Sequence, residues 1–392
     1  MTTDERRSVA VSAASALGAL SAEELAAVRA VVGFDGFIDS IIRVVDKRRS
    51  MEPEDFAPVT TITGYADRCA AAAGKSTNIE LHTVERRFGG NGPLLASAMG
   101  GLGASVTFIG AVGSAAGHTM LDPVYQPLAD RCARVYPVAP AGETDALEFD
   151  DGKIMLGKPT NVQIVTWAHI KSVVGLDVIR ELFERATTIG IVNWVMLKGV
   201  EGIWQGLMDE VFPAISKKRR RVFIDLCDPA KRTDEDLRRA ASILTDLNSH
   251  ADVTLGLNQS EAERVGKALG VDIYEGPGNQ SLGSAMRHAA LSIREKLGIA
   301  CCVVHPREGA AAADEHHDAW FEGPFTVKPS ISTGAGDHFN GGFALAQGLG
   351  FGLAQCLAVG CAVSGAYVRD AASPSRERLI EFLTDLPTSQ AG

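Results

Sequence analysis

The sequence predicts an α/β protein with three layers, in which a mostly parallel central sheet lies between helices on both faces, together with a smaller β-rich lid. Three observations support this fold class. Short apolar strands alternate with helices along the chain, as they do in proteins with parallel sheets. Each strand is almost continuously hydrophobic, which is typical of strands buried on both faces. Two longer segments interrupt the alternation with turn residues and β-prone runs, which indicates hairpins.

The first 30 residues are predicted to form a helical extension ahead of the main domain, which spans residues 31–392. Asp4 and Glu5 fit a secretory signal poorly, and residues 21–30 have the pattern of an amphipathic helix. The seven cysteines contain no CxxC pair and fall mostly in apolar segments, as reduced buried thiols do. We therefore expect a cytoplasmic protein.

Composition excludes two classes of partner. Hydrophobic residues make up 46% of the chain and charged residues 22%, and no stretch of about 18 apolar residues is free of charge. A membrane span is therefore not expected. The formal net charge is −10, and the basic cluster at residues 217–221 is short, so we expect no nucleic-acid surface.

The strands and helices of the main sheet can be predicted individually. The strands are expected at residues 30–34, 105–113, 187–196, 221–226, 252–257 and 299–305. The helices are expected at residues 91–103, 260–270, 281–298 and 350–370. The second helix carries its own signals, since Ser260 and Glu263 have capping-box spacing and Gly270 is a helix terminator.

The lid is expected at about residues 40–85 and 114–170. The run from Ala146 to Gly157 suggests a hairpin with Asp150, Asp151 and Gly152 in the turn. Ligands of α/β sheets bind outside the carboxyl ends of the strands. Insertions after the first two strands are therefore well placed to cover a ligand.

The loop from Ser330 to Gly336 precedes a small apolar helix and has the features of an anion site. A glycine-rich turn that leads into a helix exposes amide N–H groups that no helical carbonyl accepts. Asp337 would lie in the first turn, where it could accept a proton from a substrate hydroxyl. Taken alone, the same residues also suit a tight turn and a helix cap.

Three motifs in order resemble the PfkB, or ribokinase-like, family of carbohydrate and nucleoside kinases. Residues 332–343, STGAGDHFNGGF, resemble the C-terminal signature of that family, and residues 88–114 resemble its N-terminal signature. Residues 31–45 resemble its first strand. The resemblance implies that Asp337 is the catalytic base and that the amides of Gly334, Ala335 and Gly336 form the anion hole.

The N-terminal signature and first strand imply the substrate side of the site. Asp39 matches the aspartate that binds substrate hydroxyls, and Asp35 is a second candidate. Gly89 and Gly90 would let the backbone approach a sugar closely. The family often has an asparagine where this chain has Leu94, so Asn91 is the expected polar contact.

The resemblance also implies a nucleotide side and a metal. Asn258 and Glu261 match an N-x-x-E motif that organises Mg²⁺, although this pattern is also a helix cap. Nucleotide contacts are expected from Asn258 and Thr333, and from His305, Arg307 and Gly309 where the family has a T-x-G-x-x-G motif. His338 occupies a usually small position after the base.

We expect a Mg²⁺-dependent phosphotransferase that moves the terminal phosphoryl group of a nucleotide to a hydroxyl of a sugar. ATP is the expected donor, with ADP as the alternative. One alternative is an adenosine-type nucleoside kinase, for which Phe37, Tyr65 and Trp167 could hold the base. Another is a non-catalytic sugar-sensing protein. The partners would be small molecules, and the resemblance allows a homodimer that pairs through the lid.

Overall fold

The computed structural model describes residues 1–274 and 281–390. Within them a large sheet has the strand order β14-β13-β12-β11-β10-β9-β1-β5-β6. All neighbouring strands from β12 to β6 are parallel, whereas β13 and β14 are antiparallel additions at one edge. The strands are β1 (Arg29–Phe34), β5 (Ser105–Gly110), β6 (Arg134–Pro137), β9 (Thr188–Val192), β10 (Arg221–Asp225), β11 (Asp252–Leu257), β12 (Cys301–Val304), β13 (Gly309–Ala313) and β14 (Asp318–Glu322).

The six strands predicted from the sequence are confirmed as β1, β5, β9, β10, β11 and β12. Three strands of the large sheet were missed. β6 has only four residues, and four of the five residues of β13 are alanines, which have low strand propensity. These segments are strands because their neighbours in the sheet supply hydrogen-bond partners, which a local pattern does not reveal.

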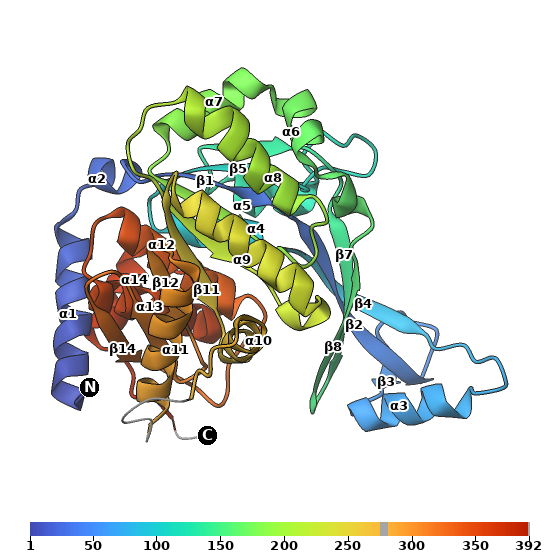
Figure 1. Ribbon diagram of the computed structural model, residues 1–392. Helices are drawn as coiled ribbons and strands as arrows, with labels where there is room; N and C mark the ends of the chain where they lie inside the picture. Colours follow the sequence, from blue (N-terminus) through green and yellow to red (C-terminus); the bar gives the residue numbers. More distant parts are fainter. Residues whose placement is uncertain (275–280, 391–392) are drawn as a thin grey trace.

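Helices cover both faces of the large sheet (Figure 1). One face carries α4 (Asn91–Gly101), α12 (Ala335–Gly348) and α13 (Leu353–Asp370). The other carries α6 (Trp167–Val174), α7 (Leu176–Arg185), α8 (Val200–Gly206), α9 (Asp234–Asn248), α10 (Gln259–Leu269) and α11 (Leu282–Leu297). The remaining helices are α1 (Thr3–Ala19), α2 (Ala22–Ala26), α3 (Ile62–Ala71), α5 (Gln126–Ala129) and α14 (Arg376–Thr384).

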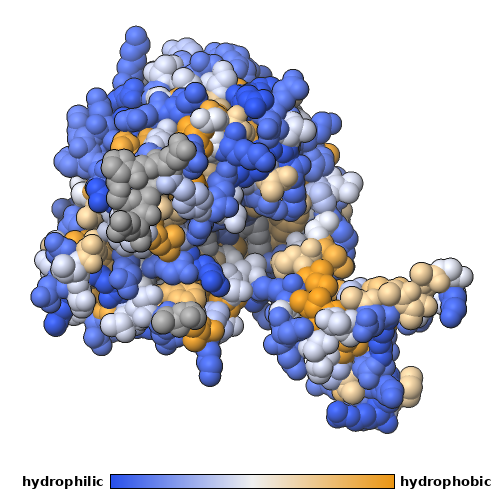
Figure 2. Space-filling view, turned by 60° about the horizontal axis from the view of Figure 1, so that its bottom comes forward, coloured by the Kyte–Doolittle hydropathy of each residue, from blue (hydrophilic) through white to orange (hydrophobic). Residues whose placement is uncertain are grey.

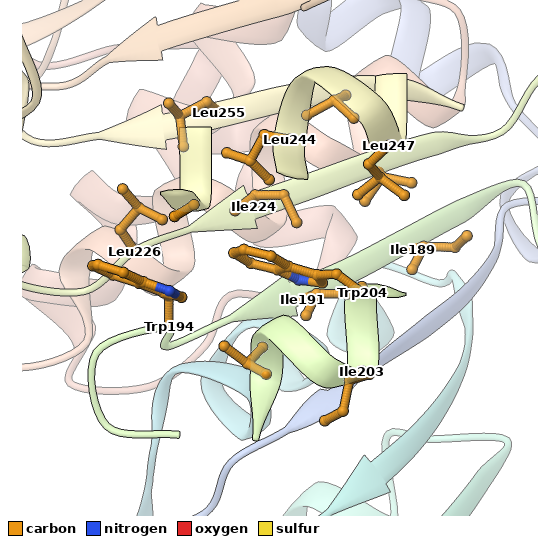
Figure 3. Packing of buried hydrophobic residues seen from close by; sticks show 14 of the residues in the cluster. Ile189, Ile191, Trp194, Ile203, Trp204, Ile224, Leu226, Leu244, Leu247 and Leu255 are labelled. Carbon is orange, nitrogen blue, oxygen red and sulfur yellow. The ribbon is translucent and has the colours of Figure 1, made fainter. Parts of the chain in front are cut away.

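Alternation along the strands divides the core into two layers. In β1, Val31 belongs to the layer under α6 to α11, and Val32 to the layer under α4, α12 and α13. Figure 3 shows the first layer, where Trp194 and Trp204 lie with the aliphatic side chains of β9, β10 and β11. Both indoles are fully buried. Because both faces of the central strands are covered, these strands are mostly apolar.

The N-terminal helix α1 packs against the C-terminal end of the chain, along α13 and α14 (Figure 1). Arg6 is buried there, and its guanidinium donates hydrogen bonds to the carbonyl oxygens of Glu322 (2.8 Å) and Pro387 (2.6 Å). The predicted extension is thus joined to the main body by packing and by buried hydrogen bonds.

A second sheet forms the lid, which projects from the body as an arm (Figure 2). A recess separates the arm from the body in this view. Its strands are β2 (Phe37–Arg48), β3 (Phe56–Pro58), β4 (Leu81–Gly89), β7 (Gly142–Phe149) and β8 (Gly152–Lys158). The lid has a small core of its own, in which Ile42, Val44 and Leu147 pack with residues of α3.

The predicted hairpin with Asp150 and Asp151 in its turn is confirmed as β7 and β8. The lid strands lie within residues 37–89 and 142–158, which overlap the lid segments expected at about residues 40–85 and 114–170. β6 lies inside the second predicted segment but pairs with β5 in the large sheet.

In the described part of the chain, no helix combines the length and apolar character needed to cross a membrane.

Candidate active site

Two helices on the same face of the large sheet begin close together and define the site. Asn91 is the first residue of α4, and Asp337 lies in the first turn of α12. Nδ2 of Asn91 donates a hydrogen bond of 2.8 Å to Oδ1 of Asp337. The structure therefore brings together the two glycine-rich segments that the sequence analysis singled out separately.

The loop before α12 requires glycine at its N-cap. Gly334 has φ +88°, a left-handed conformation that side chains disfavour. A Cβ atom there would lie 2.9 Å from Cδ1 of Leu94 and 3.1 Å from the hydroxyl of Tyr367. A glycine N-cap also has no side chain to accept the first-turn amides, which leaves them suited to an anion.

Asp337 is 8% exposed, and its carboxyl is in an electrostatic setting that suits a general base. The pKa of Asp337 is raised well above its usual range, mainly by burial. The charge of Asp225 raises it further. The hydrogen bond from Asn91 opposes it by favouring the ionised form. A raised pKa brings a carboxylate base closer to neutral pH, where proton transfer is most efficient.

The carboxylate of Asp225 lies at the end of β10 and faces α12. It accepts hydrogen bonds from Nδ2 of Asn340 (2.6 Å) and from the amide of Cys227 (2.8 Å). Burial raises the pKa of Asp225, and the charge of Glu261 raises it further. Asp228, three residues further along the chain, is exposed and pairs with Lys231 at 3.0 Å.

Asp35 is fully buried and organises the start of α4. Its carboxylate accepts hydrogen bonds from the amides of Asn91 (2.9 Å) and Gly92 (2.7 Å) and from Nδ2 of Asn193 (2.7 Å). Burial raises the pKa of Asp35, and these three donors oppose the shift. Since both of its oxygens are engaged inside the protein, Asp35 anchors the loop, and Asp39 is the better candidate for a substrate contact.

Asp39 lies on β2 of the lid, directly opposite Arg87 of β4. It is 6% exposed, and burial raises the pKa of Asp39 while Thr144, Arg87 and Lys153 oppose the shift. Gly89 must be small here, because a Cβ atom would lie 2.5 Å from Oδ2 of Asp39.

Gly90, the N-cap of α4, has φ +95°. A Cβ atom there would approach the amide nitrogen of Phe37 to 3.0 Å. The two glycines therefore let the backbone pass close to the lid strand and the buried carboxylates.

The Asn258 and Glu261 pair forms the capping box of α10, which corrects the predicted Ser260 and Glu263 pair. Oδ1 of Asn258 accepts from the amide of Glu261 (3.0 Å), and Oε2 of Glu261 accepts from the amide of Asn258 (2.8 Å). Oε1 of Glu261 accepts from the amide of Asp228 (2.9 Å). Both carboxylate oxygens of Glu261, in the first turn of α10, therefore accept hydrogen bonds from main-chain amides.

The expected nucleotide residues divide between the site and the surface. His305 follows β12, stacks on Phe339 with ring centroids 4.7 Å apart, and has a buried Nε2 without a hydrogen-bond partner among the described residues. A Cβ atom on Gly336 would lie 3.4 Å from the His305 ring.

Arg307 and Gly309, which were expected to contact the nucleotide together with His305, have different surroundings. Arg307 is exposed, and its guanidinium lies over the Phe325 ring. Gly309 begins β13, where its backbone packs against Phe321.

Three site residues were missed by the sequence analysis. Lys153 of the lid hairpin donates from Nζ to Oγ1 of Thr333, so the lid touches the anion loop directly. Arg87 adds a second lid cation whose charge acts on Asp39 and on Tyr367. Asn193 follows β9 with φ +66° and holds Asp35. Of these three, only Asn193 could have been found from the sequence, because it is a polar residue that directly follows the apolar residues of β9.

The aromatic residues proposed to hold a nucleobase pack elsewhere. Phe37 belongs to the main core, and Tyr65 packs on Phe149 within the lid. Trp167 donates from Nε1 to Glu210 at 2.6 Å. The contacts of these three rings are therefore with other parts of the protein.

A family model for prokaryotic ketohexokinase matches residues 4–386 of the chain. A ketohexokinase of Haloferax volcanii is 29% identical over 358 residues, which cover 90% of this chain and 90% of that protein.

Solved structures show the same fold at low sequence identity. A mutant of phosphofructokinase-2 from Escherichia coli has a TM-score of 0.62 and 16% identity, and covers 92% of this chain and 98% of its own. The Arabidopsis thaliana ribokinase complexed with ribose and ATP has a TM-score of 0.59 and 16% identity, over 91% of this chain and 98% of that one.

Proposed function

Because the chain belongs to the prokaryotic ketohexokinase family, and is thus a sugar kinase with the ribokinase-like fold, we propose that it phosphorylates a hydroxyl group of a ketohexose. The phosphoryl donor would be a nucleotide, ATP in the first place, with Mg²⁺ as the metal. The single observation that carries this proposal is the hydrogen bond from Asn91 to Asp337, which joins the start of α4 to the buried carboxylate that follows the glycine loop.

The chemistry follows from this arrangement. Asp337 accepts the proton of the acceptor hydroxyl as the hydroxyl oxygen attacks the terminal phosphorus. The bond between that phosphorus and the bridging oxygen breaks, and the nucleoside diphosphate leaves. The amides of Gly334, Ala335 and Gly336 and the ammonium group of Lys153 offset the charge of the transferred group.

The lid would position the acceptor and exclude water. Asp39 on β2 would accept hydrogen bonds from sugar hydroxyls, while the backbone at Gly90 and the side chain of Asn91 border the reacting hydroxyl. Excluding water matters because water competes with the sugar as the attacking nucleophile.

The carboxylates of the site suit Mg²⁺, which keeps water and phosphate oxygens as ligands, better than a metal that takes all its ligands from protein side chains. The charges of Asp225 and Glu261 help to raise the pKa of Asp337, and the charge of Glu261 helps to raise the pKa of Asp225. A divalent cation would relieve this repulsion. Within the described residues no three His, Cys, Asp or Glu side chains are grouped to hold a metal by themselves. Mg²⁺ usually takes one or two carboxylates and completes its shell with phosphate oxygens and water. Asn258 and Glu261 would hold the ion through its water shell, and the bound ion would neutralise phosphate charge.

ATP is supported as the donor by the ribokinase of Arabidopsis, which was solved with ribose and ATP. His305 is our candidate contact for the donor phosphates, because its buried Nε2 has no hydrogen-bond partner among the described residues and its ring borders Gly336. Arg307, in contrast, has a side chain that is 80% exposed and, among the described residues, is free of buried contacts that would orient it toward a phosphate.

Phosphoryl transfer to a panel of acceptors tests the proposal. Ketohexoses, aldohexoses, pentoses and adenosine would be offered with ATP or ADP, with and without Mg²⁺, and the nucleotide product measured in a coupled assay. We expect the highest kcat/KM with a ketohexose and ATP, and no transfer without a divalent cation. Preference for adenosine would support the nucleoside kinase instead, and binding of sugars without transfer would support a sugar sensor.

Pairing of two subunits through the lid stays a prediction. Strand β8 is at the edge of the lid sheet, and Met155 and Leu156 on it are exposed. Light scattering of the wild type and of a Met155→Lys variant measures this directly. A monomeric wild type would contradict the prediction.

A further inference from the structure

Two stacked aromatic rings lie behind the anion loop. The imidazole of His338, on α12, and the phenol of Tyr367, on α13, are nearly parallel, with an interplanar angle of 12° and ring centroids 3.5 Å apart. His338 is fully buried and Tyr367 is 6% exposed. This contact fills the space between the loop and the two helices.

Each ring is hydrogen-bonded to a main-chain carbonyl of the loop. Tyr367 donates from its hydroxyl to the carbonyl oxygen of Thr333 at 2.9 Å. Nδ1 of His338 lies 2.8 Å from the carbonyl oxygen of Gly334. The two carbonyls are consecutive, so both peptide planes at the start of α12 are oriented by side chains from behind.

The hydrogen-bond network determines the tautomer of His338. A carbonyl oxygen only accepts, so Nδ1 must carry the proton. Nε2 then accepts from the hydroxyl of Ser373, which is 2.7 Å away. Burial lowers the pKa of His338 to about 4, and burial raises the pKa of Tyr367 to about 12. Near neutral pH the imidazole is therefore uncharged and the phenol keeps its donor proton.

Fixing these carbonyls fixes the amides on the other side of the same peptide bonds. In a trans peptide the C=O and N–H groups point in opposite directions. Holding the Thr333 oxygen therefore fixes the direction of the Gly334 N–H, and holding the Gly334 oxygen fixes the direction of the Ala335 N–H. The Ala335 amide also closes a turn through a long bond of 3.3 Å to the Ser332 carbonyl.

We infer that His338 and Tyr367 are positioning residues that hold the anion loop in its phosphate-binding conformation, with Ser373 orienting the imidazole. This inference rests on the proposed kinase function and extends it to residues that touch neither substrate. It also accounts for a histidine at a position where the resemblance predicts a small residue. A small side chain there would leave the Gly334 carbonyl without its second donor.

Steady-state kinetics of Tyr367→Phe and His338→Ala test this inference. Misplacing catalytic groups slightly is costly, so we expect kcat to fall at least about 10-fold in each variant. The KM for the sugar should stay within about twofold of the wild type, because neither residue contacts the sugar side. Imidazole added to His338→Ala should restore part of kcat.

The matched control is Thr245→Val, on α9. Thr245 also donates a side-chain hydroxyl to a main-chain carbonyl, that of Leu297 at 2.7 Å, but it lies on the opposite face of the sheet. The control should change the melting temperature without changing kcat. The inference would be overturned if Tyr367→Phe kept the wild-type kcat. It would also be overturned if kcat and the KM for the sugar changed equally in both Tyr367→Phe and His338→Ala.

A readout independent of activity separates this inference from the proposed function. In ¹⁵N NMR of histidine-labelled protein, the imidazole signals absent from His338→Ala should report a neutral ring with the proton on Nδ1. A proton on Nε2, or a charged ring at pH 7, would overturn the inference even in an active kinase. A wild type that phosphorylates no acceptor would instead refute the proposed function, while the tautomer still reports the contact to Gly334.

Discussion

Asn91 donates a hydrogen bond of 2.8 Å to Asp337 from a position 246 residues earlier in the chain. The contact joins the first residue of α4 to the first turn of α12, so two helix N-termini and their aligned dipoles converge on one carboxylate. It also ties the proposed sugar side of the site to the proposed base. Four predictions follow from this arrangement and from the groups around it.

Replacing the base should abolish most of the activity without unfolding the protein. Asp337→Asn keeps the shape of the side chain and removes its ability to accept a proton, so turnover should fall by at least about 10²-fold. Coupled kinase assays and circular dichroism would measure activity and fold. Asp177→Asn is the control, since Asp177 is 98% exposed on α7 and should be silent. An unchanged rate in Asp337→Asn would refute its role as base.

Removing the Asn91 amide should move the pH dependence of the reaction. The hydrogen bond from Asn91 opposes the rise in the pKa of Asp337, so Asn91→Ala should raise that pKa further. A base works above its pKa, and the acid limb of the profile of kcat against pH should therefore shift to higher pH. A shift to lower pH, or none, would show that Asn91 does not act on the ionisation of Asp337.

Thermal stability should decline as the pH rises. Burial raises the pKa of Asp35, Asp39, Asp225 and Asp337. Groups whose pKa is raised in the folded state stabilise it fully below their unfolded pKa, about 4, and lose this contribution as the pH rises through the folded pKa.

Melting temperatures between pH 5 and pH 8 would measure this dependence. We expect Asp225→Asn to show a smaller decline than the wild type, and Mg²⁺ to raise the wild-type melting temperature most at high pH. A melting temperature that increases steadily over this range would contradict the prediction.

The lid lysine should matter for phosphoryl transfer. Lys153→Met removes the contact to Thr333 and one positive charge near the anion loop, so kcat/KM for the nucleotide should fall about 10-fold. Lys158→Met is a matched control on the same strand, because Lys158 pairs with Asp145 and Glu143 instead. Equal effects of the two substitutions would indicate a general charge effect of the lid.

Much of the fold could be predicted because its signals are local. Continuous apolar runs located the six central strands, and turn residues located the β7 and β8 hairpin. Edge strands β13 and β14 lacked such runs. Asn258 and Glu261 show the limit of a short motif, because the same spacing satisfies a capping box and a metal motif. The likeness to PfkB kinases, drawn from the two signatures, is confirmed by the ketohexokinase relative and the ribokinase-like structures.

The sequence by itself determined where α12 starts and that Asp337 lies in its first turn, since glycine conformation and helix termini depend on neighbouring residues. Only the tertiary structure decided that Asp35 is an internal anchor, that Lys153 reaches Thr333, and that Tyr367 holds the anion loop. These contacts join residues 34 to 180 positions apart. They depend on how the lid and helices pack, and no local backbone preference encodes that packing.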